Sequence, residues 1–96
     1  MSPLRQQLDD YLQTRRALGF KLATDGKLLA SFVAYMDAAS ADTITVAHAV
    51  RWATLPSSAK PVYHAKRLRA VRGFARYLNT LDPAHELLAT DLDLRE

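Results

Sequence analysis

The stretch at residues 60–76 is KPVYHAKRLRAVRGFAR, which contains six basic residues and no acidic one. Apolar residues recur through it at the three- and four-residue spacing of an α-helix, from Leu68 through Val71 and Phe74 to Leu78. We therefore expect a helix over residues 61–81 with an apolar side and a basic side. Such a helix suits a polyanion, and DNA is the commonest one.

The basic side of this predicted helix carries the candidate contacts. On a wheel that advances 100° per residue, Arg69, Arg72 and Arg76 lie together, opposite the apolar residues. Arg67 and His64 lie near the N-terminal end, close to the apolar boundary. The candidates on this helix and on the loop before it are Ser57, Lys60, His64, Lys66, Arg67, Arg69, Arg72 and Arg76.

Two features favour a nucleic-acid contact for these residues. The run contains no acid, so no ion pair at i,i+4 can neutralise it from within. Arginine also binds phosphates and guanine edges through two parallel hydrogen bonds, which lysine cannot match. The alternative is a solvated basic surface whose arginines pair with acids elsewhere in the chain. The residue types favour double-stranded DNA as the partner.

Three further segments have helical patterns, at residues 3–18, 25–39 and 46–55. Ser2 and Pro3 start the first and Gly19 ends it, whereas Thr24 and Thr45 are the expected caps of the other two. No stretch alternates with period two for long enough to predict a strand. We expect an all-α fold of four helices over residues 1–83, and an extended arm or linker over residues 84–96.

The helix expected at 25–39 has an unusual polar side, on which every residue except one lysine is small. These residues are Gly26, Lys27, Ala30, Ser31 and Ala34. One interpretation is a neutral surface of good helix formers, and the other is a side cleared for the close approach of a large partner. Lys27 and Ser31 are therefore further candidate DNA contacts. Trp52, on the next helix, is expected in the core rather than as a wedge between helices.

Composition excludes several other classes of function. The chain has no cysteine, which excludes disulfides and thiolate metal sites. His48, His64 and His85 are too far apart to suggest a metal site, and no glycine-rich phosphate loop is present, so we expect no metal and no cofactor. No apolar stretch approaches the roughly 20 residues of a membrane span. The N-terminus has no secretory signal, and we expect a bacterial cytoplasmic protein at the nucleoid.

Two motifs give the chain a resemblance to a known family. Residues 22–36, LATDGKLLASFVAYM, and residues 63–78, YHAKRLRAVRGFARYL, resemble two helices of the SAM-like core-binding domain of tyrosine recombinases, the phage integrase family. Asp82-Pro83 and Ile44-Thr45 also fit, and the resemblance spans about residues 3–88. One departure is Leu88-Ala89, where family members continue through a proline-rich linker.

The resemblance implies a four-helix SAM-like orthogonal bundle that binds DNA without cutting it. In the family, two arginines, a lysine, a His-x-x-Arg motif and a nucleophilic tyrosine lie on a separate catalytic domain, which closes on the duplex from the other side. The implied partners are duplex DNA, that catalytic domain and other recombinase protomers in a synaptic complex. His48-Ala49-Val50-Arg51 matches one catalytic motif, but we interpret the match as coincidence, so no catalytic residue is expected here.

Two other classes of function remain open at this point. The chain could be a helical bundle that binds a protein partner through apolar residues of its first helix and tail. It could also be a small basic accessory factor that binds DNA, as excisionases do. The first alternative predicts a defined protein complex that is indifferent to nucleic acid.

Overall fold

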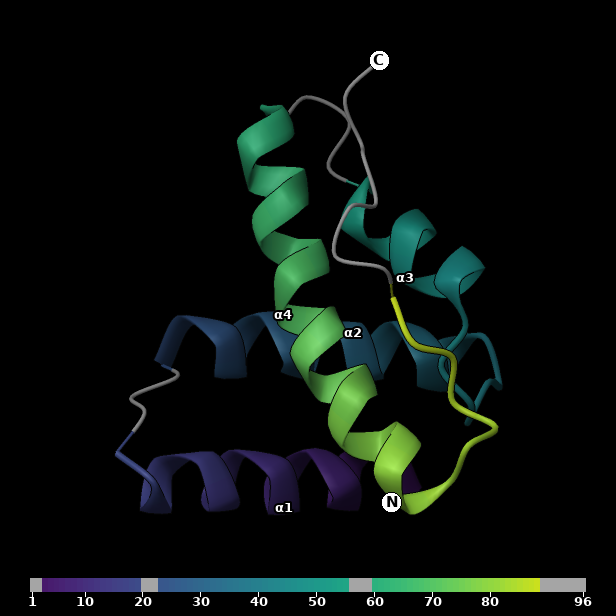
Figure 1. The fold of residues 1–96 in the computed structure, drawn as a ribbon. Coiled ribbons are helices and arrows are strands. Elements are labelled where there is room, and N and C mark those ends of the chain that lie inside the picture. The colour runs from purple at the N-terminus through teal and green to yellow at the C-terminus, as the bar shows by residue number, and fades with distance from the viewer. Residues whose placement is uncertain (1–2, 20–22, 56–59, 89–96) are drawn as a thin grey trace. The chain divides into compact units, whose positions relative to one another are not determined.

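The computed structural model describes residues 3–19, 23–55 and 60–88, and all regular structure in these ranges is helical (Figure 1). The helices are α1 (Pro3–Ala17), α2 (Ala23–Ala38), α3 (Val46–Ala53) and α4 (Pro61–Leu81). The expectation of four helices and no strand is confirmed for the described residues. The bounds of α4 agree with the prediction, whereas α1 and α3 end one and two residues early.

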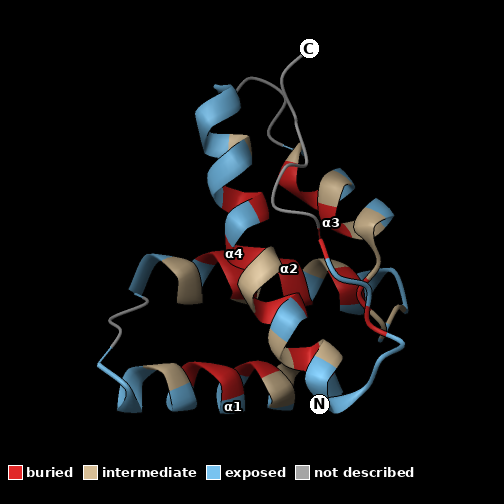
Figure 2. Cartoon of the chain, in the orientation of Figure 1, coloured by how far each residue is buried: buried red, intermediate tan, exposed pale blue. Residues whose placement is uncertain are grey.

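The chain divides into two compact units, at residues 1–42 and 43–96. The first unit contains α1 and α2, which contact each other, and the second contains α3 and α4, which also contact each other. Figure 2 colours the buried residues of each helix red. Each unit is therefore a pair of contacting helices, described below by itself, and the single domain expected over residues 1–83 stays a prediction.

The first unit is built from two amphipathic helices. Buried residues recur on α1 at Leu4, Leu8, Tyr11 and Leu12, at the i, i+4, i+7, i+8 spacing of one helix side. The helix ends at Ala17, and Gly19, the predicted cap, follows with a positive φ of 98°, a left-handed conformation that glycine adopts without strain. The buried residues of α2 are Leu28, Leu29, Phe32, Val33 and Met36.

The start of α2 differs from the prediction. The helix begins at Ala23, so Thr24 lies in its first turn and is not the residue that precedes it. At the other end, Ser40 has a φ of 55°, and the Ala41 N–H donates to the Met36 carbonyl at 2.9 Å. This six-to-one hydrogen bond around a left-handed residue closes the helix and satisfies a carbonyl of its last turn.

The second unit begins with a capped short helix. Thr45 has an extended backbone, and its hydroxyl oxygen accepts a hydrogen bond from the His48 N–H at 3.1 Å, as the sequence predicted. Trp52 on α3 is 1% exposed, which confirms its place in the core. The helix ends at Ala53, and the hydroxyl of the next residue, Thr54, donates to the Val50 carbonyl at 2.8 Å.

Residues 82–88, here called the strap, follow α4 and are attached to the segment before α3. The Glu86 N–H donates to the Ile44 carbonyl at 2.9 Å, and the Ile44 N–H donates to Nδ1 of His85 at 3.1 Å. His85 and Leu88 are both buried. The interpretation of residues 84–96 as an extended arm did not foresee this attachment of residues 84–88, whereas residues 89–96 lie outside the described residues.

Candidate nucleic-acid interface

The outer side of α4 carries the arginines singled out in the sequence. Arg69 and Arg76 are exposed and Arg72 is half-buried. With a rise of about 1.5 Å per residue, Arg69 and Arg76 lie about 10.5 Å apart along the helix axis. These three residues are called the arginine face. Among the described parts of the chain, no carboxylate pairs with any of them.

This lack of acidic partners helps to choose between a solvated structural surface and a nucleic-acid contact. A solvated structural surface would pair its arginines with acids from neighbouring elements, and the described residues offer no such pair. Clustered positive charge on one helix side attracts a polyanion over several ångströms. The arginine face therefore has the charge and the free donors that phosphate contacts need.

Other predicted contacts on α4 and the loop before it fall at its N-terminal end. Lys60 and Lys66 are exposed and His64 is half-buried. Pro61 occupies the first helical position, and Lys60 precedes it with an extended backbone and no side-chain cap. Ser57 lies outside the described residues, so its predicted role has no structural description.

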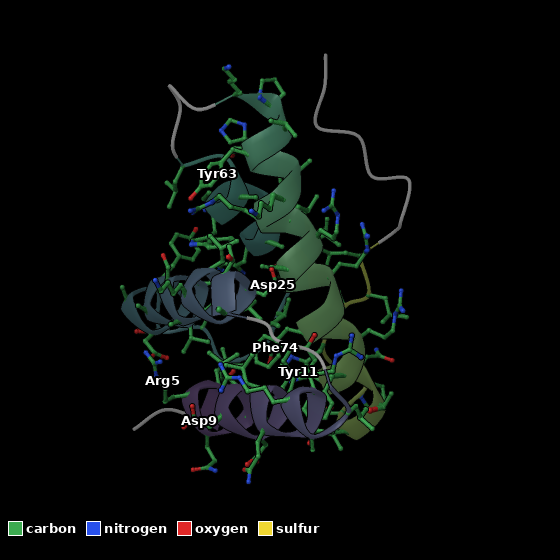
Figure 3. All side chains as sticks on the ribbon, turned by 90° about the vertical axis from the view of Figure 1, so that its left-hand side faces the viewer. Arg5, Asp9, Tyr11, Asp25, Tyr63 and Phe74 are labelled. Atoms are coloured by element: carbon green, nitrogen blue, oxygen red, sulfur yellow. The ribbon has the colours of Figure 1, made fainter. Side chains whose placement is uncertain are left out.

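Arg67 occupies a different environment from the rest of the basic run. It is 7% exposed, and its Nη2 donates to the Trp52 carbonyl at 2.8 Å. Its guanidinium carbon lies 3.8 Å from the centroid of the Trp52 ring and 5.7 Å from that of Tyr63. Figure 3 labels Tyr63 near the start of α4 and Phe74 farther along it.

The chemistry of this contact explains why an arginine is buried here. The Trp52 carbonyl belongs to the last turn of α3, where it accepts one hydrogen bond from the Leu55 N–H at 3.2 Å and can accept a second one from Arg67. A planar guanidinium can stack on the indole and donate to that carbonyl at the same time, which a lysine ammonium cannot do. Arg67 therefore joins α3 to α4, and the surface proposed below for DNA leaves it out.

The sequence contained a signal for this burial. Arg67 precedes Phe74 by seven residues, so at 100° per residue it lies about 20° from Phe74 and about 40° from Val71 on the wheel. Both of these residues are fully buried. The helical period alone places Arg67 on the inner side, whereas its charge made it a candidate DNA contact.

The small residues of α2 divide into two groups. Gly26 faces α1, because a Cβ added there would lie 3.3 Å from Nη2 of Arg16 and 3.6 Å from Cδ1 of Leu12. Lys27, Ser31 and Ala34 are exposed. Gly26 thus lies on the side of α2 that faces α1, while the exposed residues belong to a small, weakly charged surface of the first unit.

In the His48–Arg51 motif, the histidine has a structural role at the start of α3. Nδ1 of His48 lies 2.9 Å from the hydroxyl oxygen of Thr45, and the His48 N–H caps the helix. Arg51 is exposed on the last turn of α3. The histidine is thus part of the start of α3.

A metal-binding cluster and a membrane-spanning helix are both absent from the described residues. Within residues 3–19, 23–55 and 60–88, no group of three or more His, Cys, Asp or Glu side chains could hold a metal ion. In the same ranges, no helix is both long and apolar enough to cross a membrane.

Comparison with known proteins found one protein of Sinorhizobium fredii (strain NBRC 101917 / NGR234). It is named "Putative integrase/recombinase y4rB" and is 41% identical to the chain over 87 residues. The match covers 91% of the chain but 28% of that protein, so the chain corresponds to a small part of its relative. The similarity supports a relation to integrase-type proteins. No family model matches the chain, and no solved structure matches it either.

Proposed function

We propose that the chain is the DNA-binding module of a tyrosine recombinase, the part that holds duplex DNA while a separate catalytic domain exchanges the strands. The observation that carries the proposal is the arginine face of α4, which has no acidic partner among the described residues. The similarity to a protein named as an integrase/recombinase supports the same function. On this proposal, the chain alone binds DNA weakly and cleaves nothing.

The physical mechanism is neutralisation of the phosphate backbone. Arg69 and Arg76 are exposed donors spaced along one side of α4, with Lys66 and Lys60 toward its start. Each phosphate they neutralise releases a condensed counterion, which makes binding stronger at low salt. Lys27 and Ser31 on α2 are proposed as additional contacts from the first unit. The other proposed partners are the catalytic domain and further recombinase protomers in a synaptic complex. The proposed location is the bacterial nucleoid, in the cytoplasm.

The test is a salt titration of DNA binding by fluorescence anisotropy with a duplex of about 30 base pairs. The variant Arg69→Ala/Arg72→Ala should weaken binding, and the slope of log affinity against log salt should fall by about 0.9 for each phosphate that the variant no longer neutralises. Arg51→Ala, which removes the same type of charge from α3, serves as the control and should keep the wild-type slope. Equal slopes for all three proteins would contradict the proposal.

A protein-interaction bundle is the second candidate. Val62, Leu81 and Leu87 in the second unit are large apolar residues that are more than half exposed. Scattered apolar residues are normal on a protein surface, so this observation is weaker than the arginine face. Light scattering after size-exclusion chromatography distinguishes the two: a stable dimer that ignores duplex DNA favours the interaction bundle.

A further inference from the structure

The two helical glycines Gly26 and Gly73 lie in different surroundings. Glycine in the interior of a helix lowers its stability relative to alanine, so each position calls for a reason. Gly26 lies inside the first unit, where a Cβ would be 3.6 Å from Cδ1 of Leu12 and 3.3 Å from the flexible end of the Arg16 side chain. Gly73 lies in the interior of α4, is partly exposed and belongs to the outer side of the helix.

Gly73 lies in the middle of the arginine face. Arg69 is four residues before it and Arg76 is three residues after it, the spacings that place residues on one side of a helix one turn apart. Helical side chains tilt toward the N-terminus, so Arg76 leans back over the turn that contains Gly73. Cationic side chains therefore border a half-buried position at which the backbone carries no side chain of its own.

The phosphate backbone of DNA would be attracted more strongly at such a position. Coulomb attraction weakens with distance, and a duplex that reaches the helix backbone at Gly73 brings its phosphates close to the guanidinium groups on both sides. A glycine allows this approach because it has no side chain to hold the ligand away. A larger residue at the same place would hold the duplex away from the helix.

We propose that Gly73 is the point at which a phosphodiester strand of the duplex comes closest to α4, with Arg69 and Arg76 binding phosphates on either side of it. This inference rests on the proposed function, because it requires DNA on the arginine face. It adds the line along which the strand crosses the helix. It also assigns the glycine to DNA binding.

The test uses Gly73→Ala and Gly73→Leu. Alanine and leucine are both much better helix formers than glycine and differ little from each other, so both variants should unfold at a higher temperature than the wild type. Their side chains differ greatly in size, so DNA affinity should fall modestly for alanine and by at least about tenfold for leucine. Thermal unfolding by circular dichroism and anisotropy with the same duplex measure the two effects.

The control is Ala47→Leu, which adds a comparable side chain at an exposed position of α3 and should leave affinity unchanged. Wild-type affinity in both Gly73 variants would overturn the inference, and the proposed function would still stand if Arg69→Ala/Arg72→Ala weakened binding. A lower unfolding temperature for Gly73→Ala would also overturn it, because the glycine would then serve the fold.

Discussion

The two sides of α4 use the same residue type for opposite purposes. Arg67 is buried against Trp52 and bonds to the end of α3, whereas Arg69, two residues later, is exposed and has no acidic partner among the described residues. Both belong to one basic run, yet only the second is available to a ligand. Position on the helical wheel, rather than the number of charges, therefore separates a structural arginine from a binding one.

The greatest loss of stability should come from breaking the inner contact. Arg67→Ala removes a hydrogen bond from a charged donor and a desolvated stack on Trp52, and we expect it to lower the free energy of unfolding by about 3 kcal/mol. Urea unfolding followed by Trp52 fluorescence measures this loss. Arg69→Ala is the matched control, with an expected change within about 0.5 kcal/mol.

The same pair of variants also separates the two sides of α4 when DNA binding is measured on folded protein. Arg67→Ala should keep the salt slope of the wild type, because Arg67 bonds to the Trp52 carbonyl and is buried away from any phosphate. If Arg67→Ala left stability unchanged but reduced the slope, the assignment of the two sides would be reversed.

An intermediate effect is expected where the strap meets the segment before α3. His85→Ala leaves the buried Ile44 N–H without its Nδ1 acceptor and empties a buried site, which should cost about 2 kcal/mol of unfolding free energy. His85→Asn, whose side-chain oxygen can accept in place of Nδ1, is the conservative control and should recover part of the loss. Chemical denaturation of the three proteins provides the measurement, and equal midpoints would show that the strap adds nothing to the stability of the second unit.

The weakest effect concerns the charge at the start of α3. Oε1 of Glu86 accepts a hydrogen bond from the Val46 N–H at 2.8 Å, where a negative charge complements the helix dipole. Glu86→Gln keeps an acceptor oxygen but removes the charge, so we expect a loss of about 0.5 kcal/mol that disappears at high salt. Urea unfolding at low and high salt measures it, and a loss that persists in high salt would point to geometry rather than to charge.

Local patterns predicted most of the fold. Pro61 and the apolar repeat defined α4 at both ends, and Thr45 was identified as a cap because its hydroxyl needs only an N–H three residues away. The helical wheel also separated Arg69 and Arg76 from the apolar residues of the same helix.

The strap and the role of Arg67 were missed because both depend on distant partners. His85 and Ile44 are 41 residues apart, and Arg67 and Trp52 are 15 apart, so no short motif records either contact. For Arg67, the helical period indicated an inner position but not the partner. Its long aliphatic stem lets the charged group reach a carbonyl inside a mostly apolar environment.

The most direct test of DNA binding by the outer side of α4 is a titration of the ¹⁵N-labelled chain with duplex DNA at low salt, followed by amide chemical shifts. We expect the largest shifts at Arg69, Arg72, Gly73 and Arg76, together with an unmoved indole N–H of Trp52. The absence of shifts along α4 would contradict the proposed role of the arginine face.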